Sequence, residues 1–189
     1  MLTDILVSSL RLLTAFYITI VLLRFLLQIS RADFYNPISQ FVVKATNPLL
    51  APLRKVVPGI GGFDGASLVL AILIQTLVFV IIASLAGAPL HLVTYIAWSA
   101  VVVLNLLVQI YFWAAIAMII LSWVAPGSYH PAVQLLHQIT EPVMRPFRRL
   151  LPPVGGLDLS PILLFLTINV VQVVVAYLGN AVGLSRFWF

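Results

Sequence analysis

The sequence contains no cysteine and very few charged residues. The absence of cysteine among 189 residues excludes disulfides, thiol nucleophiles and thiolate metal sites, although it says nothing about the redox compartment. Only 8% of the residues are charged, against about 25% in a typical soluble domain. A further 62% are hydrophobic, and the mean hydropathy is +1.15. Because this leaves too little polar surface to cover a water-soluble globule, we expect an integral membrane protein.

Four apolar stretches have the length of about 20 residues that crosses the hydrocarbon core of a bilayer. We predict membrane spans over residues 5–29, 66–87, 99–124 and 161–182. The first stretch follows Met-Leu-Thr-Asp, with an acid where a signal peptide carries basic residues, so we expect it to be retained as a membrane helix. Residues 88–98 are predicted to form an interfacial linker, with Tyr95 and Trp98 at the headgroup level. One long tilted helix in this region is the alternative.

The sequence contains an internal repeat. Residues 35–64 align with residues 129–158 without a gap at an offset of 94, and eleven of the thirty positions are identical. Prolines, glycines and charges at fixed offsets specify a backbone path, so the repeat indicates a shared three-dimensional unit. The offset also maps the first span onto the third and the second onto the fourth, which gives parallel repeats. We therefore predict an all-α membrane protein with repeat 1 in residues 1–87, the linker in 88–98 and repeat 2 in 99–189.

Basic residues outside the spans gather in the two loops of the repeats. They are Arg31, Lys44, Arg54, Lys55, Arg145, Arg148 and Arg149, whereas the opposite side has only Arg186. By the positive-inside rule, both loops are expected to be cytoplasmic and both termini to lie outside. The predicted location is the inner membrane of a bacterium, crossed several times.

Each loop is expected to contain an amphipathic helix. Apolar residues recur at helical spacing up to Pro48 and Pro142, where we predict the first helix to break and a second short helix to begin. The first helix either lies in the headgroup boundary or packs against the bundle. The basic residues predicted to contact anionic lipid or a protein partner are Arg54, Lys55, Arg145, Arg148 and Arg149.

Glycines and an acid follow each basic segment. Gly61 and Gly62 are predicted to turn the chain back into the bilayer, and Asp64 to cap the next helix. Their counterparts in repeat 2 are Gly155, Gly156 and Asp158. Two alternatives remain for the acids: an ion pair with Arg54 or Arg148, or a carboxylate pair that binds an ion.

A few polar side chains fall inside the predicted spans, namely Arg24, Gln75, Asn105 and Asn169. Arg24 is expected to extend toward the interface. Gln75 and Asn169 occupy matched positions in the second and fourth spans. Hydrogen bonding between helices is the expected role of the amides, and lining a hydrated path is the alternative.

No pattern of catalytic residues is present. His130 and His137 are seven residues apart, but no carboxylate repeats beside them. The sequence also lacks a P-loop, a serine–histidine–aspartate set and a zinc-binding spacing. We therefore expect no enzymatic activity, no cofactor, no metal and no direct nucleic-acid partner.

Both loops carry a recurring motif that resembles the YggT family. In repeat 1 it runs from Asn36-Pro37 through Ala51-Pro52-Leu53-Arg54-Lys55 to Gly61-Gly62-Phe63-Asp64. In repeat 2 the corresponding segments are Arg145-Pro146-Phe147-Arg148-Arg149 and Gly155-Gly156-Leu157-Asp158. The chain looks like the two-copy proteobacterial form along its whole length.

The resemblance implies an accessory role and no defined reaction. Members of the family are associated with osmotic stress and ion uptake, with division or nucleoid organisation, and with assembly of haem-bearing photosynthetic complexes. Two functions therefore remain open. The first is a scaffold that binds lipid and a larger membrane complex, or a second copy of itself, through its basic loops. The alternative is a small oligomeric channel or ion-transport accessory.

Overall fold

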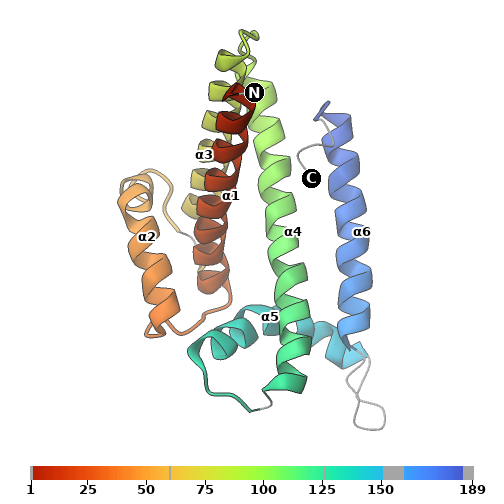
Figure 1. The fold of residues 1–189 in the computed structure, drawn as a ribbon. Helices are drawn as coiled ribbons and strands as arrows, with labels where there is room; N and C mark the ends of the chain where they lie inside the picture. Colours follow the sequence, from red (N-terminus) through yellow and green to blue (C-terminus); the bar gives the residue numbers. More distant parts are fainter. Residues whose placement is uncertain (1, 60, 126, 151–159, 185–189) are drawn as a thin grey trace.

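Six α-helices form the part of the protein described by the computed structural model, which covers residues 2–59, 61–125, 127–150 and 160–184 (Figure 1). The helices are α1 (Leu2–Ile29), α2 (Pro37–Leu53), α3 (Gly65–Leu85), α4 (Leu92–Val124), α5 (Pro131–Leu150) and α6 (Ser160–Ala181). Of these, α1, α3, α4 and α6 are long and apolar enough to cross a membrane. The predicted all-α architecture with four candidate spans is confirmed.

The spans pack in the order that the repeat predicts. In repeat 1, α1 packs against α3, and in repeat 2, α4 packs against α6. The two repeats meet mainly where α3 packs against α4, with smaller contacts of α1 against α4 and of α5 against α1 and α2. Figure 1 shows the start of α1 and the end of α6 at one end of the bundle, with α2 and α5 toward the other. Two parallel tandem repeats with their loop helices on the same side are therefore confirmed.

Each loop helix contributes to the core of its own repeat. Leu50 of α2 is fully buried against Ile18 and Leu22 of α1 and Ala71 of α3. The corresponding cluster of repeat 2 consists of Val108, Ala115, Met144, Leu164 and Ile168. Met144 of α5 stands at the position that matches Leu50, so the two loops are anchored at equivalent points.

The segment predicted as an interfacial linker is largely helical. Helix α4 is continuous over 33 residues. At 1.5 Å per residue it is about 50 Å long, against about 30 Å of hydrocarbon. Its first turns are held by the protein itself: Tyr95 stacks on Phe79 at 6.1 Å between ring centroids, and Trp98 Nε1 donates to the carbonyl of Val182 at 2.8 Å. These contacts favour the single long helix over a separate linker.

The prediction that Pro48 and Pro142 break the loop helices is wrong. Helix α2 continues through Pro48 and Pro52, and α5 continues through Pro142 and Pro146. All four prolines are exposed, so their rings and the carbonyls that lose a helical N–H lie away from the packed face. The two helices are placed differently in Figure 1, where α2 stands beside α1 and α5 runs across beneath α4.

Candidate functional site

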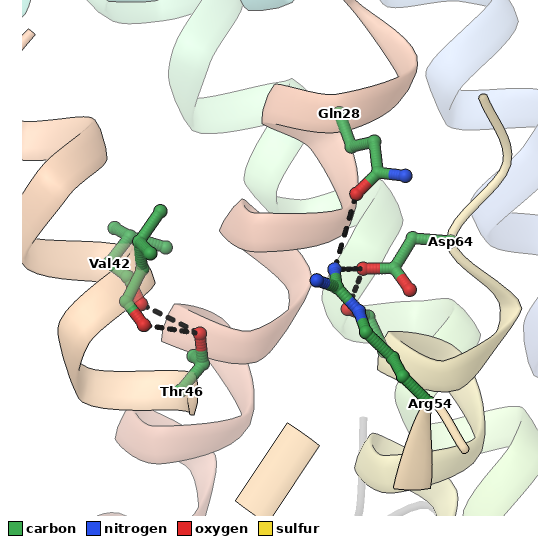
Figure 2. Close-up of polar contacts among 7 residues, drawn as sticks. Gln28, Val42, Thr46, Arg54 and Asp64 are labelled. Carbon is green, nitrogen blue, oxygen red and sulfur yellow. Dashed lines mark hydrogen bonds and ion pairs between the residues drawn. The ribbon is translucent and has the colours of Figure 1, made fainter. Parts of the chain in front are cut away.

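An ion pair with a buried carboxylate closes the loop of repeat 1. Arg54, which follows the last residue of α2, places its Nη2 2.6 Å from Oδ2 of Asp64, and the same nitrogen donates to Oε1 of Gln28 at 3.2 Å (Figure 2). Ser67 Oγ donates to the same Asp64 oxygen at 2.6 Å. Asp64 is 1% exposed and the Arg54 side chain 33%. The loop is thus fastened to both α1 and α3.

Asp64 was expected to cap the following helix, and its side chain does not do so. It stands at the N-cap position of α3, but it makes no side-chain cap hydrogen bond. The carboxylate accepts from Arg54 and Ser67 instead. The ion pair, which the sequence left as an alternative, is therefore the arrangement found in repeat 1.

The two glycines before Asp64 both have a positive φ, a backbone conformation that glycine permits. Gly61 has φ of +60° and Gly62 has φ of +89°, values that residues with a side chain rarely adopt. The pair reverses the chain between α2 and α3. The matching residues of repeat 2, Gly155, Gly156 and Asp158, lie outside the described residues.

Arg24 is buried instead of reaching the interface as expected. It is 7% exposed, and its guanidinium lies over the ring of Phe34 at 5.6 Å from the centroid. Neither Nε nor Nη1 has a hydrogen-bond partner among the described residues. An aromatic ring from the start of the loop thus faces the guanidinium, an arrangement in which the charge is attracted to the ring.

The basic segment of repeat 2 is more exposed. Arg148 Nη1 lies 2.5 Å from Oε2 of Glu141, with side-chain exposures of 39% and 47%. The residue of repeat 1 that matches Glu141 is Asn47, so this pair has no counterpart there. Arg145 and Arg149 are exposed, as are Lys44 and Lys55 in repeat 1. The two loops therefore share one pair of adjacent basic residues, Arg54-Lys55 and Arg148-Arg149, but the two arginines have different partners.

Asn36 joins the two loops, a role that the sequence did not reveal. Its Oδ1 accepts from the N–H of Ile38 and caps α2, while its Nδ2 donates to the carbonyl of Pro131 at 2.8 Å. Asp33 adds a second bond, from its N–H to Oε1 of Gln138 at 2.9 Å. The Asn-Pro pair at a helix start was the available signal, but only for the cap.

A shallow groove lies beside these contacts. Its volume is about 440 Å³, and it is lined by Ser30, His137, Gln138, Glu141, Pro142 and Arg145. The hydroxyl of Ser30 has no hydrogen-bond partner among the described residues. His130, which immediately precedes α5, accepts at Nδ1 from the N–H of Ala132 at 3.2 Å and so occupies the cap position that matches Asn36. No group of three or more potential metal-ligating side chains comes together in the described ranges.

The polar residues of the spans do not share one environment. Gln75 and Asn105 are buried, at 4% and 7% exposure, whereas Asn169 is exposed on α6. Between the spans of the two repeats, two hydroxyls form a polar contact: Thr76 Oγ1 of α3 lies 2.9 Å from Ser99 Oγ of α4.

Comparison with known families finds one family unit twice in this chain, in agreement with the repeat seen in the fold. The family model for CCB3/YggT matches residues 3–85 and again residues 97–179. The chain belongs to the CCB3/YggT family. The matched ranges cover nearly all of α1 and α3 in one copy and most of α4 and α6 in the other, so each copy of the YggT unit is one pair of spans with its loop helix.

Relatives of this YggT-family chain include proteins of one and of two units. An uncharacterized protein of Pseudomonas aeruginosa is 53% identical over 165 residues, which cover 86% of this chain and 84% of the relative. The uncharacterized protein YggT of Escherichia coli is 39% identical over 171 residues, 88% and 87% of the two chains. The uncharacterized protein ycf19 of Guillardia theta is 32% identical over 72 residues. Those residues cover 38% of this chain but 79% of ycf19, which is therefore long enough for one unit and not for two. No solved structure matches.

Proposed function

We propose that this protein is a non-enzymatic scaffold of the bacterial inner membrane, whose loop side binds anionic lipid of the cytoplasmic leaflet and a larger membrane complex. The proposal rests on four exposed basic side chains of the loops: Lys44, Lys55, Arg145 and Arg149. Each loop helix buries an apolar stripe against the spans, so these cations are carried on surfaces turned away from the core. Near an anionic bilayer each such charge contributes about 1 kcal/mol of attraction.

Exposed aromatic residues beside the cations support an interfacial position. Tyr35 and Tyr129 stand at matched positions before α2 and α5, and they are 89% and 88% exposed. Phe41 and Leu49 are exposed on the outer face of α2. Tyrosine at the headgroup level and apolar side chains just below it are typical of a membrane boundary.

Arg54 and Arg148 take a smaller part in this proposal than the sequence indicated. The charge of Arg54 is opposed by a buried carboxylate, and that of Arg148 by Glu141. We assign Arg54 to holding the loop in place. The role in osmotic stress or in complex assembly that the family resemblance implies would then act through the exposed cations.

The test compares a charge-neutral variant with a charge-preserving one. Lys44, Lys55, Arg145 and Arg149 are all changed to Gln in the first variant, and Lys and Arg are exchanged at the same positions in the second. Each protein is reconstituted into phosphatidylcholine vesicles with and without phosphatidylglycerol, and protease cleavage of the loops is followed. We expect anionic lipid to protect the loops of wild type and of the charge-preserving variant, and not those of the neutral variant. Equal protection of all three would overturn the lipid proposal.

Crosslinking in native membranes tests the second half of the proposal. The same three proteins are crosslinked and purified, and the proteins recovered with them are compared. A complex recovered with wild type and with the charge-preserving variant, but not with the neutral variant, is the expected result. Equal recovery with the neutral variant would show that the cations do not recruit the complex.

The channel alternative loses the residues on which it depended. It required Gln75 and Asn169 to form a polar layer along a path, but Gln75 is buried and Asn169 is exposed on the outer face of α6. One chain therefore does not bring these two amides to a common surface, and we favour the scaffold.

A further inference from the structure

The contact between the two repeats supplies a template for a contact between two chains. Inside the chain, the second span of repeat 1 (α3) packs against the first span of repeat 2 (α4). Thr76 meets Ser99 there, Phe79 packs edge-on against Trp98 at 5.5 Å, and Val103 is buried with Ala71. Because the repeats are parallel, α6 is the counterpart of α3 and α1 is the counterpart of α4.

The counterpart surfaces are both exposed. Ser99, Val103 and Leu106 of α4 map onto Ile5, Ser9 and Leu12 of α1 at the offset of 94. All three α1 residues are exposed, and Leu12 is 73% exposed.

The same holds on α6. Thr76, Phe79 and Ala83 of α3 map onto Val170, Val173 and Tyr177, which are all exposed, Tyr177 by 74%. The outer faces of α1 and α6 thus correspond to the two halves of an interface that the chain already forms once.

Exposed apolar surface needs no partner in a bilayer, because lipid tails are as apolar as leucine. Asn169 is different. It lies near the middle of α6 on the exposed side, whereas its counterpart Gln75 is buried. An amide that faces hydrocarbon lacks hydrogen-bond partners, so the α6 face has a reason to be covered.

We propose that α6 of one chain packs against α1 of a second copy of this chain, in the geometry of the internal contact between α3 and α4. At this register, which places Val170 opposite Ile5, Asn169 is level with Leu6. Ser8 and Ser9 are exposed two and three residues further along α1, a distance of about 3–4.5 Å along the helix axis, and their hydroxyls are suitable partners for the amide. Small hydroxyl residues and amides are enriched where membrane helices pack. The contact joins two different surfaces, α6 of one copy and α1 of another. Both surfaces of every copy are covered only when the assembly closes on itself.

A relative with a single unit is consistent with this assignment. The ycf19 protein of Guillardia theta is long enough for one unit only. A one-unit chain carries both outer faces and has no second unit of its own to cover either. The inference is independent of the lipid-binding proposal, because it uses the spans and none of the loop cations.

Disulfide crosslinking tests the contact, since the chain has no cysteine of its own. Ile5→Cys and Val170→Cys correspond to Ser99 and Thr76. We expect a crosslinked dimer when the two single variants are coexpressed and oxidised in membranes, and none when either is expressed alone. The control T76C/S99C should form its disulfide within one chain. Dimers formed equally well by Val170→Cys alone would show α6 pairing with itself, and absence of any dimer while the control crosslinks would show that no such contact exists; either result overturns the proposal.

A second measurement tests the role of the amide. Asn169→Leu should weaken association in detergent or bilayers by about threefold to tenfold, the effect of one hydrogen bond between membrane helices. Thr167→Val is the matched control, because Thr167 is exposed on α6 but bonds to the carbonyl of Leu163 in its own helix. Its counterpart Leu73 is exposed in repeat 1, so Thr167 lies off the proposed face. Equal effects of the two variants would contradict the assignment of Asn169.

Discussion

Neutralising Asp64 should destabilise the protein far more than neutralising the acid of the other ion pair. Asp64→Asn keeps the size of the side chain and an acceptor for Ser67, but it removes the charge that faces Arg54 at 2.6 Å. A hydrogen bond to a charged group contributes about 1.5–3 kcal/mol. Arg54 is one-third exposed and can turn partly to solvent, which places the expected loss at about 2 kcal/mol. The ratio of folded to unfolded protein would then fall about thirtyfold.

Glu141→Gln is the matched control. It is also an acid-to-amide change opposite an arginine, but both side chains are well exposed. Exposed pairs contribute about 0.2–1 kcal/mol. The free energy of unfolding of both variants is measured by denaturant titration in mild detergent, alongside wild type. If the two changes lower it equally, or if Asp64→Asn stays within about 0.5 kcal/mol of wild type, the assignment of Asp64 as the fastening point of the loop is refuted.

Three further outcomes are expected. Cysteines introduced at the exposed positions Asn47 and Ala88 should react with an impermeant reagent from opposite sides of the membrane, Asn47 from the cytoplasm; labelling of both from one side would contradict the topology. Gly61→Ala should lower the free energy of unfolding by about 1 kcal/mol because of its positive φ, whereas Gly65→Ala, which meets no atom closer than 3.7 Å, should change it little. Asn36→Asp keeps the cap of α2 but loses the donor to Pro131, so crosslinking between the loops should weaken while the helix content measured by circular dichroism stays constant; a loss of helix would show that only the cap matters.

The spans and the repeat could be predicted because both are carried by the sequence alone. Hydropathy over about 20 residues needs no tertiary information, and the predicted boundaries at 5–29 and 66–87 agree with α1 and α3 to within a few residues. The repeat needed only the gapless offset. The start of α4 was harder to predict, because its first turns are stabilised by Phe79 and by the carbonyl of Val182, which are distant in sequence.

Details of the site depended on which face a residue occupies. A proline inside a helix leaves one carbonyl without its N–H partner, and Pro48 lies on the exposed face of α2, where a group outside the helix can bond to that carbonyl. Arg24 could reach an interface by its length, but Phe34 covers it. The sequence allowed Asp64 either to cap α3 or to pair with Arg54. In the structure Arg54 and Ser67 both donate to one oxygen of its carboxylate, and the side chain does not cap the helix. The spacing of residues in the sequence does not by itself predict any of these three arrangements.

The outward prolines of α2 also determine how the bilayer meets this protein. Pro48 and Pro52 each lack an N–H, so the carbonyls of Lys44 and Pro48 have no donor within the helix. Hydrocarbon supplies no donor either, and lipid-exposed backbone groups without partners are not tolerated there. Because α2 stands upright beside α1 (Figure 1), water or headgroups must follow its outer face at least as far as Pro48. We therefore expect the bilayer to be thinner beside repeat 1 than beside repeat 2, where α5 lies across the bundle. A difference in bilayer thickness around the protein would favour lipids with shorter chains beside repeat 1. It would also make the two sides of the protein unequal to its neighbours in the plane of the membrane, although its two units are similar.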